Sequence, residues 1–398
     1  MRDAVIVGAA RTPIGKFGGA LASLSAPQLG AIAVRAAVER AGIDPASVEE
    51  VMMGQVIAAG SGQAPGRQAA ILGGLPDTVG AISVNKACGS GLKAAMLSAS
   101  AIKAGDGDVF VAGGMESMSN APYLLPRHSI GGRFGNVQML DSLVSDGLWC
   151  SFENHMMGNA AEFIADKLEV TREEMDEFAL NSHRKALAAI DAGKFKGEIA
   201  PVEVKDAKGR VTIVDTDEPP RRDTSLDALA RLKPAFRPDG RVTAGNAPGL
   251  NDGAAAVVVM SRESAEAEGL RPLARIVGYT HAAVDPLWLF IAPARAVPRL
   301  LDQIGWRLED ADLIEINEAF AAQVLADGRA LEQAGHTWDW DKVNVHGGAV
   351  ALGHPVGASG ARVLVTLLHT LQDRNKERGI ATLCLGGGEA VAMAIEME

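Results

Sequence analysis

The stretch ISVNKACGSGLKAAMLSASAIKAGDGDVFVAGG (residues 82–114) decides the fold, because its pattern returns near the C-terminus. There, VNVHGGAVALGHPVGASGARVLVTLLHTLQDRNKERGIATLCLGGG (343–388) repeats the order strand, glycine-rich turn, Ser-Gly, helix, strand and paired glycines. The stretches that precede them, AVIVGAARTP (4–13) and LARIVGYTHAAVDP (273–286), are also alike. Internal repetition predicts a duplicated structural unit, so we expect two similar α/β halves that face each other. The alternative is that any two strand–helix–strand units would look this similar without duplication.

Composition and charge exclude several classes of protein. The chain has 398 residues, of which 47% are apolar, enough for two or three domains with a large core. Its net charge of −11 argues against general nucleic-acid binding. No apolar run approaches the ~20 residues of a membrane span. Three cysteines are too few for a disulfide framework, and neither end of the chain reads as a targeting signal. We therefore expect a cytoplasmic protein that binds neither nucleic acid nor membrane.

Local patterns place the first elements of the chain. Residues 4–10 predict a buried strand, and residues 25–42 predict a helix with Ser25 as its N-cap and Gly42 at its end. Residues 48–56 predict a further strand. This alternation of strand and helix predicts a mostly parallel sheet that is covered by helices on both faces.

The middle of the chain, residues 121–249, predicts an inserted loop domain. It is richer in proline, methionine and charge than its surroundings, with hinge-like segments such as DEPPRRDTS (217–225). Within it, residues 221–241 carry six Arg or Lys against three Asp: Arg221, Arg222, Arg231, Lys233, Arg237 and Arg241 against Asp223, Asp227 and Asp239. In an acidic chain, this excess favours contact with an anionic ligand, and the alternative is a solvated basic face.

Cys88 lies where a strand-like stretch (81–84) meets a helical one (92–105), with glycines beside it. A helix N-terminus stabilises a thiolate, so the position has the features of a nucleophile with a lowered pKa. The alternative is a small buried thiol in the core.

A nucleophilic cysteine needs a base, and His354 stands in the glycine-rich loop GGAVALGHPVGASG (347–360). The alternative for His354 is an ordinary histidine of a surface loop.

Two further candidates follow strands of the second half. Cys384, in TLCLGGGEAV (382–391), is a candidate acid or base at a strand end, or else a core cysteine. Asn317 follows the strand DLIEI (312–316) and opens a helical stretch (317–335). Asparagine is a favoured helix N-cap, and its amide is also able to hold a water or an oxyanion. Because ligands in such sheets bind beyond the carboxyl ends of strands, we expect one pocket to gather all four candidates.

With these residues in view, the chain resembles a thiolase from end to end, most closely the branch of the family that forms acetoacetyl-CoA. Seven stretches match the family's motifs in order and spacing: ARTPIGKFGG (10–19), NKACGSGLKA (85–94), GGMESMSNAPY (113–123), TAGNAPGLNDGAAA (243–256), NEAFAAQ (317–323), GGAVALGHPVGASGAR (347–362) and CLGGG (384–388). The resemblance implies a thiolase-like α/β fold, in which two βαβαβ-type halves stack as α-β-α-β-α layers. It implies an N-terminal half at 1–120 and 250–271, a loop domain for CoA binding and oligomer contacts at 121–249, and a C-terminal half at 272–398.

The resemblance also implies a mechanism that uses no metal and no redox cofactor. Cys88, activated by His354, attacks an acyl-CoA thioester and takes its acyl group. Cys384 then removes a proton from a second acetyl-CoA, and the enolate attacks the acyl-cysteine to give acetoacetyl-CoA. His354 and a water on Asn317 hold the enolate oxygen, and the backbone N–H groups of Cys88 and Gly386 stabilise the tetrahedral intermediate. The reverse reaction is thiolysis of a 3-ketoacyl-CoA.

For the CoA substrate, the resemblance implies a set of contacts in the insert and beside the catalytic residues. Arg221 approaches the nucleotide, and Met157 and Phe320 flank the acyl group. The pantetheine arm runs along Ala244, Gly245, Gly249 and Leu250. The family also implies a homo-oligomer, either a dimer or a tetramer.

The chain departs from the family pattern at several positions. Met156 stands where biosynthetic members carry a histidine, and both Ala228 and Pro248 replace serines. Phe290 replaces a glycine, which adds bulk. None of these is a catalytic candidate, and each bears on acyl-chain length or on CoA affinity.

Three alternatives for the function stay open on the sequence. The nearest is a degradative 3-ketoacyl-CoA thiolase of broader chain length. A ketoacyl-synthase-like condensing enzyme shares the fold, but it would use a second histidine where this chain has Asn317-Glu318. The presence of Cys88, His354 and Cys384 speaks against a non-catalytic lipid-binding or scaffold protein.

Overall fold

The computed structural model describes residues 2–130, 134, 136–206 and 208–398, and its centre is one large sheet. The strands of this sheet are β1 (Ala4–Arg11), β2 (Gly15–Lys16), β3 (Glu50–Gly54), β4 (Gly80–Val84), β5 (Val109–Ser117), β12 (Asn251–Ser261), β13 (Ala274–Ala283), β14 (Leu313–Ile316), β15 (Arg378–Leu385) and β16 (Glu389–Met397). They lie in the order β14-β15-β16-β13-β1-β12-β5-β3-β4, with β2 beside β12. Strands of the two halves are therefore neighbours at β1 and β13.

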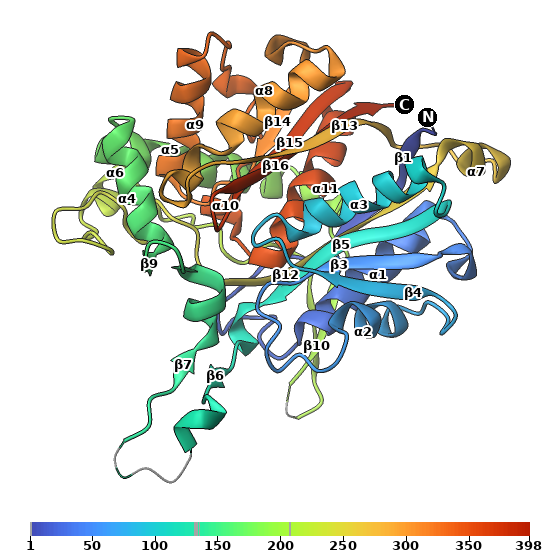
Figure 1. Cartoon of the computed structure of the whole chain (residues 1–398), viewed down its shortest axis with the longest axis horizontal. Helices are drawn as coiled ribbons and strands as arrows, with labels where there is room; N and C mark the ends of the chain where they lie inside the picture. The colour runs from blue at the N-terminus through green and yellow to red at the C-terminus, as the bar shows by residue number, and fades with distance from the viewer. Residues whose placement is uncertain (1, 131–133, 135, 207) are drawn as a thin grey trace.

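Helices cover this sheet in layers. They are α1 (Ala26–Ala41), α2 (Pro65–Leu72), α3 (Ser90–Ala104), α7 (Arg262–Ala267), α8 (Pro293–Ile304), α9 (Ala321–Gln333), α10 (Ala349–Leu352) and α11 (Val356–Arg374). Helices α1 and α2 pack on the outside of the first-half strands, α8 packs on the outside of the second-half strands, and α3 and α11 lie between the two (Figure 1). The layers run α-β-α-β-α, and the predicted α/β class is confirmed.

The prediction of a mostly parallel sheet is wrong, because the sheet is mixed. Parallel ladders join β3 to β4, β3 to β5 and β14 to β15, whereas the other strand pairs of this sheet are antiparallel. The physical reason lies in the connections. A tight turn joins β15 to β16, and β12 enters from the insert rather than from a crossover helix, so neither strand has to run parallel to its neighbour.

Local sequence explains where α1 begins and ends. The Ser25 hydroxyl accepts a hydrogen bond from the Gln28 N–H, and the Gln28 side chain accepts one from the Ser25 N–H, which closes a capping box. Gly42 ends the helix in the left-handed conformation that glycine adopts readily. The helix predicted at 25–42 is confirmed to within one residue at each end.

The Ser-Gly pairs of the repeat let α3 and α11 cross closely. A Cβ at Gly91 would lie 2.6 Å from the backbone nitrogen of Ala361, and a Cβ at Gly360 would lie 2.5 Å from the backbone nitrogen of Leu92. Any side chain at either glycine would push the helices apart, because the opposing atoms are backbone and cannot turn aside. The repeat thus brings together the starts of the two helices and the residues just before them.

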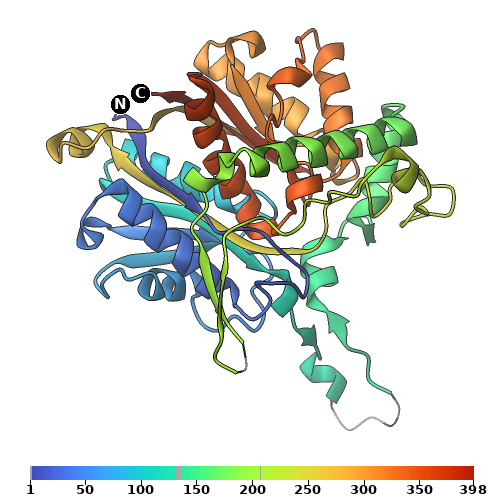
Figure 2. The same ribbon diagram turned by 180° about the vertical axis from the view of Figure 1, so that it is seen from behind.

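The insert packs on both halves of the chain. Its elements are β6 (Tyr123–Leu124), β7 (Leu140–Asp141), β8 (Trp149–Cys150), β9 (His155–Met156), α4 (Met157–Lys167), α5 (Arg172–Asp191), β10 (Val202–Lys205), β11 (Val211–Val214) and α6 (Leu226–Ala230). Helix α5 lies across the second half, and the segment that carries β6 and β7 projects from the body of the molecule (Figure 2).

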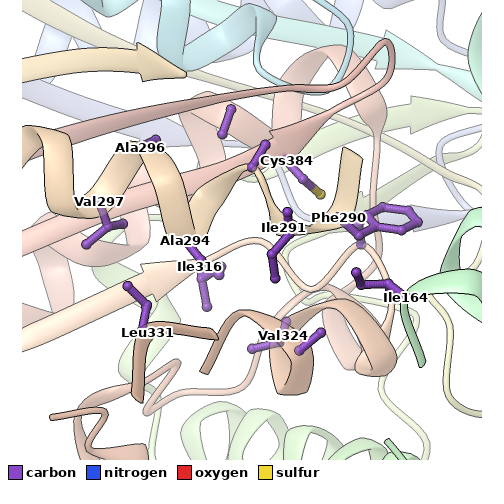
Figure 3. Packing of buried hydrophobic residues seen from close by; sticks show 14 of the residues in the cluster. Ile164, Phe290, Ile291, Ala294, Ala296, Val297, Ile316, Val324, Leu331 and Cys384 are labelled. Atoms are coloured by element: carbon purple, nitrogen blue, oxygen red, sulfur yellow. The ribbon is translucent and has the colours of Figure 1, made fainter. Parts of the chain in front are cut away.

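One buried core lies on the outer face of the second half, where α4, α8 and α9 meet the 3-10 helix η6 (Pro286–Ile291). Figure 3 shows Ile291, Val297, Ile316 and Val324 packed together there, with Cys384 at the edge of the cluster. Each fully buried aliphatic side chain stabilises the fold by roughly 1.5–3 kcal/mol. This rigid layer carries one wall of the site described next.

Candidate active site

A cavity of about 340 Å³ lies where the two halves meet the insert. Its walls include four of the predicted catalytic positions, Cys88, His354, Cys384 and Gly386. The fifth, Asn317, is buried beside His354. The structure therefore brings together residues that lie far apart in the sequence.

Cys88 lies in the turn between β4 and α3, one residue before the helix N-cap, Gly89. The turn is tight enough that Ala87 adopts a left-handed conformation, with φ of 44°, which non-glycine residues rarely take. This turn places Cys88 in the wall of the cavity, where it also packs against two clusters of the core. The backbone N–H groups of Gly386 and of Cys88 itself act on the thiol and lower its pKa.

The Cys88 thiol is not a preformed thiolate. Burial raises its pKa to about 11, and the charge of Glu116 adds to this rise, whereas the two N–H donors lower it. The prediction that the helix N-terminus lowers this pKa is wrong, because desolvation outweighs the helix end and its N–H groups. The sulfur therefore needs a base that takes its proton as it attacks.

His354, which lines the same cavity, is the candidate for that base. Its backbone N–H donates to Asn251 Oδ1 at 2.9 Å, and its ring Nδ1 lies 2.6 Å from Ser359 Oγ. Because the Ser359 hydroxyl donates to the Pro355 carbonyl at 3.0 Å, it accepts from Nδ1–H, and this leaves Nε2 unprotonated. Burial, together with the charge of Arg362, lowers the pKa of His354 to about 3. The imidazole is neutral at neutral pH and is able to accept a proton.

Asn317 offers its side-chain amide to the same histidine. Its Nδ2 lies 3.5 Å from His354 Nε2, and its Oδ1 is buried without a hydrogen-bond partner among the described residues. The helix predicted at 317–335 begins four residues later, at Ala321, so the prediction of its start is wrong. The Asn317 N–H is held by the carbonyl of Thr382 in the neighbouring strand, so the chain is still extended there. Asn317 is therefore not an N-cap, and its side chain is not used by the helix.

Cys384 lies at the end of β15 and is buried. Burial raises the pKa of its thiol well above the ordinary value, and the nearby Cys88 and Asp327 raise it further. Two thiols and one imidazole, all uncharged at rest, thus share one cavity. Such a set is able to pass protons without creating a buried charge in the resting enzyme.

The predicted substrate contacts divide into two groups. Met157, Gly249, Leu250 and Phe320 line the cavity. Ala244, Gly245 and Arg221 lie outside its walls: the Gly245 N–H donates to Thr243 Oγ1 at 3.1 Å, and the Arg221 N–H donates to His183 Nδ1 at 3.2 Å.

The basic segment 221–241 is partly used within the chain. Arg222 pairs with Asp191, and both Arg237 and Arg241 pair with Asp166. These pairs tie the segment to α4 and α5, so only part of the basic excess is left for a ligand.

The family description "Thiolase, N-terminal domain" matches residues 4–263, and "Thiolase, C-terminal domain" matches residues 270–397. The chain belongs to the thiolase family. The thiolase-like fold predicted from the sequence motifs is confirmed.

Several relatives of this thiolase resemble it over nearly their whole length. An acetyl-CoA acetyltransferase of Pseudomonas aeruginosa is 55% identical over 395 residues, covering 99% of each chain. One of Cupriavidus necator is 54% identical over 396 residues, covering 100% of each. The crystal structure of the Bacillus anthracis acetyl-CoA acetyltransferase superposes with a TM-score of 0.97 at 46% identity, covering 100% of this chain and 99% of that one.

Some residues that shape the thiolase site were missed from the sequence. Phe236 and Cys150 line the cavity, and Ser359 and Asn251 hold His354. Ser359 belongs to the Ser-Gly pair of the repeat, which was a usable signal. Nothing local marks Phe236, because it reaches the cavity from the insert.

Among the family departures of this thiolase, Met156, Pro248 and Phe290 line the cavity, whereas Ala228 lies on α6 outside its walls.

Among the described residues, no helix combines the length and apolar character needed to cross a membrane. The same part of the chain holds no group of three or more His, Cys, Asp or Glu side chains placed to bind a metal ion.

Proposed function

We propose that this thiolase condenses two molecules of acetyl-CoA to acetoacetyl-CoA and CoA, and catalyses the reverse thiolysis, through an acyl-Cys88 intermediate. The observation that carries the proposal is the shared cavity of Cys88, His354 and Cys384, in which His354 presents an unprotonated Nε2. The names of its close relatives support acetyl-CoA as the substrate.

The resting protonation states suit thiolysis directly. His354 takes the proton of Cys88 as the sulfur attacks the 3-keto carbon of acetoacetyl-CoA, and the N–H groups of Cys88 and Gly386 stabilise the oxyanion. The bond between C2 and C3 then breaks, and the acetyl-CoA enolate leaves. Cys384, kept as a thiol by burial, donates its proton to that enolate. Asn317, beside Nε2 of His354, is placed to help hold the enolate oxygen.

The second half-reaction restores every proton. The thiol of CoA attacks the acetyl group on Cys88 and gives its proton to the Cys384 thiolate. The Cys88 sulfur leaves and recovers its proton from His354. Condensation is the same path in reverse, so it needs no further group.

A chain-length profile of thiolysis tests the proposed function. The purified protein should cleave acetoacetyl-CoA with the highest kcat/KM, and cleavage should decline for longer 3-ketoacyl-CoAs. A profile that peaks at a longer chain would instead indicate a degradative thiolase of broader chain length, which the relatives do not favour.

We also propose a homo-oligomer that works in the cytoplasm. The edge strand β4 is largely exposed, with Ile82 at its centre, and the projecting segment exposes Tyr123 and Leu140. Unpaired edges and exposed apolar side chains favour association with a second copy. Light scattering should give a dimer or tetramer, and a monomer would contradict the proposal. All three cysteines are free, which suits a reducing compartment.

A further inference from the structure

Three phenylalanines from distant parts of the chain form one wall of the cavity. They are Phe236 in the insert, Phe290 on η6 and Phe320 before α9. The ring centroids of Phe290 and Phe320 are 5.4 Å apart at an interplanar angle of 67°, and those of Phe236 and Phe320 are 6.3 Å apart at 79°. Such edge-to-face contacts fix ring orientation. The wall is therefore a set of interlocked rings rather than independent side chains.

The rings of this wall have little space to move away from the cavity. A Cβ at Gly158 would overlap the ring of Phe236, so that ring already presses against the backbone of α4. Phe290 is only 3% exposed and belongs to the same core cluster as Ile164 and Cys384. Figure 3 shows the ring of Phe290 next to Cys384, with Ile164 close by. Packed protein, rather than solvent, lies behind the ring.

We propose that Phe290 is a specificity-determining residue, whose ring closes the cavity beside Cys384 and restricts the enzyme to short acyl chains. The inference rests on the proposed function, because it assumes that an acyl group lies near Cys88 and Cys384. On this proposal, an acetyl or acetoacetyl group on Cys88 ends before the ring. A longer chain has to displace Phe290, and with it the contact to Phe320. Each methylene that a closed apolar pocket rejects changes kcat/KM by roughly 10-fold or more.

The test compares thiolysis of 3-ketohexanoyl-CoA and acetoacetyl-CoA by wild type, Phe290→Leu and Phe290→Met. Leucine removes the ring, and methionine keeps much of the bulk but makes it flexible. The ratio of kcat/KM for the longer substrate over the shorter one should rise roughly 10- to 100-fold in Phe290→Leu and less in Phe290→Met. Thermal denaturation followed by circular dichroism shows that each variant is folded.

Phe195→Leu is the matched control. Phe195 is equally buried at 3% exposure and also packs edge-on against another ring, that of His346, but it belongs to a separate core cluster. Its variant loses the same atoms and should leave the ratio unchanged. A wild-type ratio in both folded Phe290 variants would overturn the role of Phe290 in chain-length specificity and leave the proposed function standing. A wild type that cleaves neither 3-ketoacyl-CoA would overturn the proposed function, and with it the specificity role of Phe290.

Discussion

The Nδ1 atom of His354 lies 2.6 Å from the Oγ atom of Ser359. This contact fixes the tautomer of the imidazole, because Ser359 donates its own hydrogen to the Pro355 carbonyl and has only lone pairs left for Nδ1–H. The other ring nitrogen, Nε2, is thereby left unprotonated in a histidine that lines the same cavity as Cys88. A hydroxyl in the first turns of α11 thus decides what His354 is able to do in the cavity.

Replacing Ser359 with alanine should lower kcat without unfolding the protein. The imidazole loses its anchor and divides between two tautomers, so we expect a decrease of roughly tenfold, about 1.4 kcal/mol. Steady-state thiolysis of acetoacetyl-CoA measures it. Ser98→Ala is the control. Ser98 is also a buried helix serine, but its hydroxyl donates to the Ala94 carbonyl and to Met52 Sδ and contacts no histidine among the described residues. Equal activity of Ser359→Ala and wild type would contradict the role of the contact.

The parts of the fold that depend on local, repeated sequence patterns were predictable. The two copies around Cys88 and His354 and the cap at Ser25 follow from residue type and spacing, whereas the close crossing at the Ser-Gly pairs appears only in the structure. The antiparallel pairing of β12 was not predictable in the same way, because it depends on where the insert returns the chain to the sheet. Strand direction is a property of connections, which propensity does not record.

The shared cavity of Cys88, His354 and Cys384 was predictable, whereas part of the lining and the electrostatics were not. Sequence placed Cys88 at a helix start, yet burial in the folded chain raises the pKa of its thiol. Asn317 had the residue type of an N-cap, and its backbone bond to Thr382 overrides that preference. Both corrections come from tertiary contacts, which local patterns do not contain.

The pH dependence of Cys88 alkylation should respond to Glu116. This carboxylate accepts the N–H groups of Val56, Ile57 and Gly357 at 3.0, 3.2 and 2.9 Å, and burial raises its pKa to about 7. Its negative charge above that pH opposes a second negative charge on Cys88 and so raises the pKa of the thiol. Glu116→Gln should therefore lower the pKa of Cys88.

Iodoacetamide measures the effect directly. In the alkaline range below pH 11, where wild-type Cys88 is mostly protonated, Glu116→Gln should be alkylated faster than wild type at every pH. Glu203→Gln, at an exposed position on β10, should match wild type. A variant that is folded by circular dichroism but alkylated no faster would show that the charge of Glu116 does not reach Cys88.

The junction of the two halves should be intolerant of added volume at Gly114. A Cβ there would collide with the carbonyl oxygen of Gly357, which is backbone at the start of α11 and cannot turn away. We expect Gly114→Ala to destabilise the protein by roughly 1–3 kcal/mol and to lower activity, because α11 carries His354 into place. Urea denaturation measures the first effect. Gly197→Ala, whose nearest neighbour would be 3.4 Å away, should change stability little. Equal stability of the two variants would contradict the close packing.

The Asn317 amide should matter for the enolate more than for acyl transfer. Its Nδ2 lies 3.5 Å from His354 Nε2, and the proposed mechanism puts the enolate oxygen beside these two groups. We expect Asn317→Ala to lower condensation about 100-fold while the protein still takes an acetyl group from acetyl-CoA. Exchange of the acetyl-CoA methyl protons with deuterium reports enolate formation separately. Asn120→Ala, on the exterior, is the control. Unchanged exchange in Asn317→Ala would remove Asn317 from the oxyanion hole.

The most direct test is mass spectrometry of the protein after brief incubation with acetyl-CoA. Wild type and Cys384→Ala should both carry one acetyl group on the peptide that contains Cys88, and Cys384→Ala should then condense poorly. Cys88→Ala should carry none. An acetyl group that persists in Cys88→Ala, or that sits on another side chain in wild type, would contradict Cys88 as the nucleophile.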